Sequence, residues 1–115
     1  MSVIIYHNPR CSKSRETLAL LETQGVTANV VEYLKDPISL ETLSELLTQL
    51  GFDSAHQLVR SKETLYKELG LSKDTDEATL RQAMIDNPKL IERPIVVNNG
   101  KAALGRPPES VLNIL

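Results

Sequence analysis

Residues 4–18 read Ile4-Ile5-Tyr6-His7-Asn8-Pro9-Arg10-Cys11-Ser12-Lys13-Ser14-Arg15-Glu16-Thr17-Leu18. The apolar residues at the start predict a buried strand, and the Asn-Pro pair that follows marks a turn. An amphipathic helix is predicted over residues 12–24, ending at Gly25. Residues 26–33 are rich in β-branched side chains and predict a second strand. This order is a βαβ unit, so we expect the two strands to be parallel.

The middle of the chain predicts helices. Leucines at a spacing close to 3.6 residues predict a helix over residues 40–50. Residues 53–87 have a helical pattern throughout, with interruptions at Gly70 and before Asp76. We therefore expect a helical insertion at about residues 38–88.

The last part of the chain predicts two antiparallel strands. Residues 95–97 and 101–104 are short apolar runs, and the Asn-Asn-Gly sequence between them favours a hairpin turn. A short helix with a proline in its first turn ends the chain. The order β-α-β, helical insertion, β-β-α predicts an α/β fold with a thioredoxin-like mixed sheet, in a single domain over residues 1–115. Pro94 stands where such a sheet usually has a cis proline.

Composition excludes several classes of protein. A length of 115 residues fits one domain, and 15 acidic against 13 basic residues give a net charge of −2, which argues against nucleic-acid binding. No apolar run approaches the roughly 20 residues of a membrane helix, and no basic-then-apolar leader precedes the first strand. The single cysteine cannot form an internal disulfide, which suits a reducing compartment, so we expect a cytoplasmic protein.

Cys11 is the candidate catalytic residue. A thiol at the start of a helix faces unpaired backbone N–H groups and the positive end of the helix dipole, and Arg10, Lys13 and Arg15 flank it. These features predict a pKa below about 8.5 for the thiol, and the same N–H groups suit an oxyanion. The alternative is a buried, unreactive cysteine, which is the commoner role for a lone cysteine in a small domain.

Ser14 completes a Cys-x-x-Ser pattern, because it stands where dithiol oxidoreductases have a second cysteine. The thiol could form a mixed disulfide but would need an outside thiol to resolve it. His7, near the end of the first strand, would add positive charge if protonated or hydrogen-bond within the loop if neutral, and a purely structural role stays open. One cysteine and two distant histidines do not form a metal-ligand set.

Three arginines stand at predicted element boundaries: Arg60 in the helical block, Arg93 before the third strand and Arg106 after the fourth. Each guanidinium offers paired donors that suit a tetrahedral oxyanion. Each is also a candidate surface arginine, because sequence spacing does not show whether the three converge on the thiol.

Five segments in order carry a resemblance to a known family: Tyr6-His7-Asn8-Pro9-x-Cys11-x-x-Ser14-Arg15, Arg60, Glu68-Leu69-Gly70-Leu71, Leu90-Ile91-x-Arg93-Pro94-Ile95-Val96-Val97 and Gly105-Arg106-Pro107. Together they resemble the glutaredoxin-coupled arsenate reductase family, over essentially the whole chain. The resemblance implies a cytoplasmic oxidoreductase of thioredoxin-like fold. Cys11 would attack arsenate, glutathione would join the arsenic, and glutaredoxin would complete the reduction to arsenite.

The resemblance also implies roles for individual residues. Substrate binding falls to Arg60, Arg93 and Arg106, and support of the thiol to His7, Asn8 and Ser14. We expect a monomer with no metal and no bound cofactor, using glutathione as co-substrate. Two alternatives stay open: a glutathione-dependent thiol reductase or transferase of the same family, and a non-enzymatic transcriptional regulatory module that docks on RNA polymerase.

Overall fold

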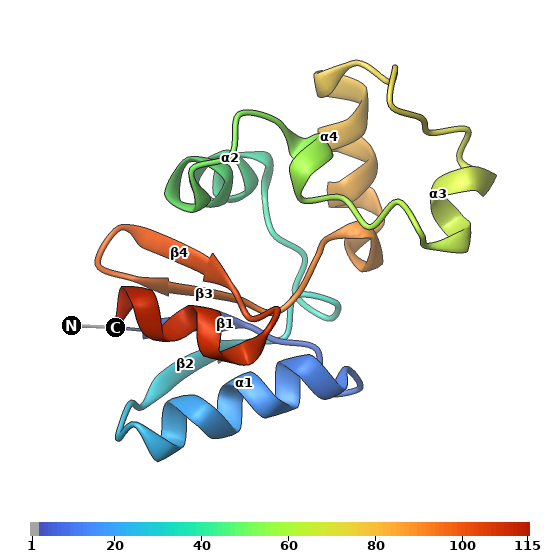
Figure 1. Cartoon of the computed structure of the whole chain (residues 1–115). Coiled ribbons are helices and arrows are strands. Elements are labelled where there is room, and N and C mark those ends of the chain that lie inside the picture. Colours follow the sequence, from blue (N-terminus) through green and yellow to red (C-terminus); the bar gives the residue numbers. More distant parts are fainter. Residues whose placement is uncertain (1–2) are drawn as a thin grey trace. The chain divides into compact units, whose positions relative to one another are not determined.

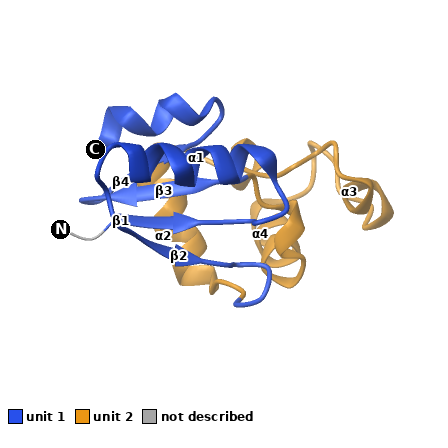
Figure 2. Cartoon of the chain, turned by 90° about the horizontal axis from the view of Figure 1, so that it is seen from below, with its two compact units in different colours: residues 1–36, 93–115 blue, residues 37–92 orange. Residues whose placement is uncertain are grey.

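The computed structural model describes residues 3–115 and divides the chain into two compact units (Figure 2). The first unit joins the N-terminal segment up to Asp36 to residues 93–115, and the second comprises Pro37–Glu92. The bounds of the second unit lie close to those expected for the helical insertion, and the assignment of the chain to one domain stays a prediction. Within residues 3–115, no helix has both the length and the apolar character needed to cross a membrane.

A four-stranded mixed sheet of order β2-β1-β3-β4 forms the first unit (Figure 1). The central strand β1 (Val3–Tyr6) pairs in parallel with β2 (Ala28–Val31) and antiparallel with β3 (Ile95–Asn98). β3 in turn pairs antiparallel with β4 (Lys101–Leu104). Helix α1 (Ser12–Thr23) makes the crossover between the two parallel strands. The predicted βαβ unit and the predicted hairpin are both confirmed.

Helix α1 and the C-terminal 3-10 helix η3 (Pro108–Ile114) cover one face of this sheet (Figure 2). The core beneath them is formed by alternate residues of the strands and by one residue from each helix: Val3, Ile5, Leu21, Val96 and Val111. Burying side chains of this size contributes roughly 1.5–3 kcal/mol each. This packing holds α1 against β1, so the first turn of the helix stays at the carboxyl end of the central strand.

The ends of these elements follow the local sequence. Gly25, with a φ of 76°, ends α1 in the left-handed conformation that the sequence predicts. Asn99 and Gly100 also have positive φ, as the tight turn between β3 and β4 requires. Strand β2 is shorter than the predicted 26–33, because the Val26 N–H donates to Leu21 O and so closes the helix instead of pairing in the sheet.

The second unit contains α2 (Leu40–Leu50), α3 (Thr64–Glu68) and α4 (Glu77–Asp86). Two short 3-10 helices accompany them, η1 (Ala55–Gln57) and η2 (Pro88–Leu90). The bounds of α2 agree with the predicted helix over 40–50.

The predicted interruptions at Gly70 and before Asp76 are confirmed, because both lie in the non-helical residues 69–76. The prediction of a helical pattern is wrong for residues 58–63, which form turns and an isolated bridge. Val59 forms an isolated antiparallel bridge with Ile91, and the Arg60 N–H donates to Leu90 O at 2.7 Å. The N–H groups of Leu58 and Val59 still donate to Ala55 O in the preceding turn, but Leu58 O and the Arg60 N–H bond across to residues 90–92. The apolar side chains of Leu58 and Val59 are buried although this segment is not a helix.

Candidate active site

Cys11 lies where β1 turns into α1, and it is the N-cap residue of that helix. Its N–H donates to Asn8 O at 3.0 Å, and the Asn8 side-chain oxygen accepts from the Arg10 N–H at 3.0 Å. Asn8 therefore closes the loop from both its backbone and its side chain. Cys11 is only 8% exposed, so the thiol is largely covered by the residues around it.

The pKa of Cys11 is lowered from its ordinary value. Burial acts in the opposite direction and raises the pKa, since it disfavours the charged form. The backbone N–H of Ser14, the positive charge of Arg93, the backbone N–H of Lys13 and a hydrogen bond from Arg93 together outweigh it. The predicted direction of the shift is therefore confirmed: the first turn of α1 and one distant arginine stabilise the thiolate.

The prediction that the side chains of Arg10, Lys13 and Arg15 supply the stabilising charge is wrong, since none of the three charges is among the causes of the shift. Lys13 acts through its backbone N–H, and its ammonium lies 3.5 Å from Glu16. Arg15 donates to Pro9 O at 2.9 Å. At the start of a helix the backbone N–H groups point toward the capping residue. The side chains of Arg10, Lys13 and Arg15 are instead exposed to solvent.

Ser14 and His7 form a buried pair beside the thiol turn. Ser14 Oγ accepts from the Asn8 N–H at 3.0 Å and lies 2.6 Å from His7 Nδ1. Burial lowers the pKa of His7, Arg15 adds to the decrease and Glu32 opposes it. A neutral imidazole follows at neutral pH, so of the two roles considered for His7 the structure supports the hydrogen-bonding one. The three supporting residues His7, Asn8 and Ser14 hold the turn in shape and add no charge to it.

Arg93 reaches the thiol from the start of β3, and its charge acts directly on the sulfur. Its Nε and Nη1 atoms are buried and have no hydrogen-bond partner among residues 3–115. Buried donors nearly always have a partner, so this arrangement is typical of a site that binds an acceptor group. Arg106 is exposed, and its Nε donates to Arg93 O at 3.0 Å. The first unit therefore brings the Arg93 guanidinium to Cys11 and ties Arg106 to the backbone of Arg93. The Arg93–Pro94 peptide bond is cis, as the position of Pro94 suggests.

Arg60 lies in the second unit, directly after the Val59–Ile91 bridge. Its guanidinium pairs with Glu63 at 2.8 Å and with Glu92 at 3.3 Å, in a part-buried cluster. Two carboxylates already compensate its charge, so an oxyanion would have to compete with them. The role of Arg60 as an oxyanion ligand stays a prediction.

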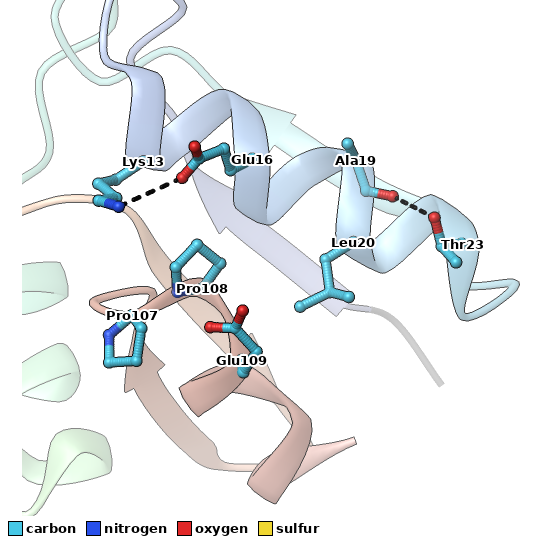
Figure 3. Close-up of a pocket in the computed structure, with 8 residues that line it drawn as sticks. All are labelled: Lys13, Glu16, Ala19, Leu20, Thr23, Pro107, Pro108 and Glu109. Carbon is cyan, nitrogen blue, oxygen red and sulfur yellow. Dashed lines mark hydrogen bonds and ion pairs between the residues drawn. The ribbon is translucent and has the colours of Figure 1, made fainter.

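Two grooves border the thiol turn within the first unit. One, of about 490 Å³, separates α1 from the segment after Arg106, and the α1 side chains face that segment across it (Figure 3). Its lining residues are Lys13, Glu16, Ala19, Leu20, Thr23, Pro107, Pro108 and Glu109. The other, of about 240 Å³, is lined by His7, Asn8, Pro9, Arg10, Glu32, Leu34 and Lys35. Cys11 itself lines neither groove. Within residues 3–115 no cluster of His, Cys, Asp or Glu has the form of a metal site.

The site combines a thiol of lowered pKa with unpartnered guanidinium donors, and comparison with known proteins identifies the family of the chain. Residues 6–114 match the family model described as "ArsC family". The chain belongs to the ArsC family. An arsenate reductase of Haemophilus influenzae is 52% identical over 116 residues, with all of both chains covered. The uncharacterized protein YfgD of Escherichia coli is 61% identical over 114 residues, covering 98% of this chain and 96% of the relative.

Solved structures agree with this ArsC-family assignment. An arsenate reductase from Vibrio cholerae superposes with a TM-score of 0.96 at 57% identity, covering 100% of this chain and 98% of the other. The resemblance stated from the sequence and the predicted thioredoxin-like fold are thus both confirmed.

Two residues close to this ArsC-family site do not stand out in the sequence. Thr17 is fully buried in α1, and Gly105 lies directly after β4 in contact with it. The only sequence signal for Gly105 is that it is an isolated glycine between an apolar strand and Arg106-Pro107. Such a glycine indicates that another part of the chain approaches the backbone closely, but the sequence does not show which part.

Proposed function

We propose that this ArsC-family protein is an arsenate reductase that forms a covalent adduct between Cys11 and arsenic. The observation that carries the proposal is the Arg93 guanidinium, which has two buried, unpartnered donors beside a thiol with a lowered pKa. Leaving such donors unpaired is unfavourable by roughly 1–3 kcal/mol for each group, and an oxyanion would compensate for it. Relatives named arsenate reductase support arsenate as that oxyanion.

The proposed reaction uses the sulfur as a nucleophile. The Cys11 thiolate attacks As(V), an S–As bond forms, and one arsenate oxygen leaves as water after accepting two protons. The thiol of glutathione then displaces a second oxygen, again as water, so that the arsenic has two sulfur ligands. Neither step changes the oxidation state of arsenic. Arg93 and Arg106 would hold the remaining oxygens and stabilise the charge during attack.

Reduction requires a further thiol, because Cys11 is the only cysteine in the chain. A glutaredoxin thiolate attacks the glutathione sulfur, and an S–S bond forms between them. The bond between the glutathione sulfur and arsenic breaks, and its electron pair passes to arsenic. Hydroxide then displaces the resulting As(III) from Cys11 as arsenite. The proposal includes Arg60 as a third oxyanion ligand. It also includes glutathione as co-substrate, no bound cofactor, and a monomer in the cytoplasm.

One observation favours a second candidate, a glutathione-dependent thiol reductase or transferase. The smaller groove contains two cations, Arg10 and Lys35, that could receive the carboxylates of glutathione. Lys35 already lies 3.6 Å from Glu32, so only part of this charge is uncompensated. The unpartnered donors of Arg93 lie outside this groove, which makes the oxyanion reaction the better-supported one.

Arsenite formation distinguishes the two reactions. We expect arsenite from a mixture of the protein, arsenate, glutathione and glutaredoxin, and a loss of turnover when any one of them is omitted. A glutathionylated peptide is assayed in parallel under the same conditions. Rapid release of glutathione from the peptide, without arsenite in the complete mixture, would select the second candidate and reject the first.

A further inference from the structure

We propose that Gly105 is a positioning residue for the oxyanion site. Its missing side chain lets the end of β4 pack directly on α1 and on Pro94, and this contact sets Arg93 and Arg106 against Cys11. The proposal deepens the proposed function and rests on it for one readout, the response to arsenate. A second readout, the ionisation of Cys11, is independent of the substrate.

The space at Gly105 does not admit a side chain. A Cβ atom built there would overlap Thr17 Oγ1, lie 2.7 Å from Pro94 Cγ and lie 3.1 Å from Thr17 Cγ2. Cβ atoms in proteins essentially never lie within 3.0 Å of such neighbours. Gly105 is the one glycine of this chain whose φ lies outside the left-handed region. Glycine is therefore required here for space and not for backbone conformation.

Thr17 has little freedom to yield to a larger residue. Its side chain is fully buried, and its Oγ1 donates to Lys13 O at 2.8 Å. As a β-branched residue within a helix it also has few χ1 rotamers. The carbonyl that it binds belongs to the same helical turn whose Lys13 and Ser14 N–H groups stabilise the thiolate. The residue that Gly105 contacts is thus tied to the turn that holds the sulfur.

Gly105 is also linked to the segment that contains Arg93 and to Arg106. The Gly105 N–H donates to Pro94 O at 3.0 Å, and the next residue, Arg106, donates from Nε to Arg93 O at 3.0 Å. These two hydrogen bonds join the end of β4 to the segment that precedes β3. A displacement of Gly105 away from α1 would therefore carry Arg93 and Arg106 away from the thiol together.

The test compares Gly105→Ala with the wild-type protein in two measurements. We expect the midpoint of Cys11 alkylation by iodoacetamide to move to higher pH, because Arg93 contributes less to the thiolate. We also expect at least a tenfold increase in the arsenate concentration that half-protects Cys11, equivalent to about 1.4 kcal/mol. Thermal unfolding of each variant is recorded, since a merely structural role would lower the melting temperature without moving the alkylation midpoint.

A rescue variant makes the test specific to the contact. Thr17→Ala removes both threonine atoms that crowd the new methyl group and leaves only Pro94 Cγ close to it. Thr17→Ala/Gly105→Ala should therefore return both measurements part of the way toward wild type. Thr17→Ala alone completes the double-mutant cycle. If Gly105→Ala does not fold, the double variant is expected to fold, for the same reason.

Three results would overturn the proposal: an unchanged alkylation midpoint and unchanged arsenate protection in a folded Gly105→Ala protein, a double variant no closer to wild type than the single one, or a double variant that also fails to fold. Absence of arsenate protection in the wild-type protein would instead reject the proposed function. The alkylation midpoint would still decide the role of Gly105 in that case.

Discussion

Replacement of Cys11 by serine is expected to reduce arsenite formation to the rate without enzyme. A serine hydroxyl stays protonated at neutral pH, and oxygen cannot replace sulfur in the thiol chemistry that passes electrons to arsenic. The fold should be retained, because Cys11 is the N-cap of α1 and serine is among the preferred residues at that position. Arsenite formation and thermal unfolding, measured on the same preparation, separate the two effects.

Ser12→Ala is the matched control for this variant. It removes an exposed hydroxyl one residue further along the same helix and should retain wild-type turnover. If Cys11→Ser formed arsenite as fast as the wild-type protein, the sulfur would not be the nucleophile, and the covalent mechanism would be rejected.

Arg93→Ala is expected to raise the arsenate concentration needed for half-maximal turnover by about 10- to 150-fold. Loss of one hydrogen bond to a charged group weakens binding by roughly 1.5–3 kcal/mol, which corresponds to that range of concentration. The same variant should shift Cys11 alkylation to higher pH, because the charge of Arg93 lowers the pKa of the thiol. Steady-state kinetics across a range of arsenate concentrations measure the first effect.

Two further variants control for charge and for geometry. Lys101→Ala removes an exposed cation at the opposite end of β4 from Arg106 and should leave the arsenate requirement unchanged. Arg93→Lys keeps the charge without the planar pair of donors, so it should recover the alkylation midpoint better than arsenate binding. A wild-type arsenate requirement in Arg93→Ala would show that this guanidinium does not bind the substrate.

The fold of the first unit follows closely from local sequence signals. The Asn-Asn-Gly turn, Gly25 at the end of α1 and the apolar runs each specify one element, and short connections fix their order. The second unit is harder to predict, because a short apolar run such as Leu58-Val59 fits a buried helix or a buried extended segment equally well. The hydrogen bonds of Leu58 and Arg60 to residues 90–92 hold the segment in its non-helical form, and nothing in the local sequence predicts that pairing.

The candidate site also has features that local sequence predicts and features that it does not. The lowered pKa of Cys11 was predictable because backbone N–H groups at a helix N-terminus depend only on secondary structure. The identity of the stabilising cation was not, since Arg93 reaches the thiol through the pairing of β1 with β3. The role proposed for Gly105 depends on its lack of a side chain. Only the packing of Thr17 in α1 and Pro94 around Gly105 shows that a side chain would not fit.

The proposed mechanism requires that the pKa of Cys11 is lowered and that the same site binds an oxyanion. The most direct test is the rate of Cys11 alkylation by iodoacetamide as a function of pH, with and without arsenate. Because the pKa of the thiol is lowered, the alkylation rate should be half-maximal at a pH below about 8.5. The rate should decrease as the pH is lowered further and the thiol becomes protonated. Arsenate should slow the reaction in a saturable way. A midpoint at or above that value, together with alkylation that arsenate does not slow, would contradict the account.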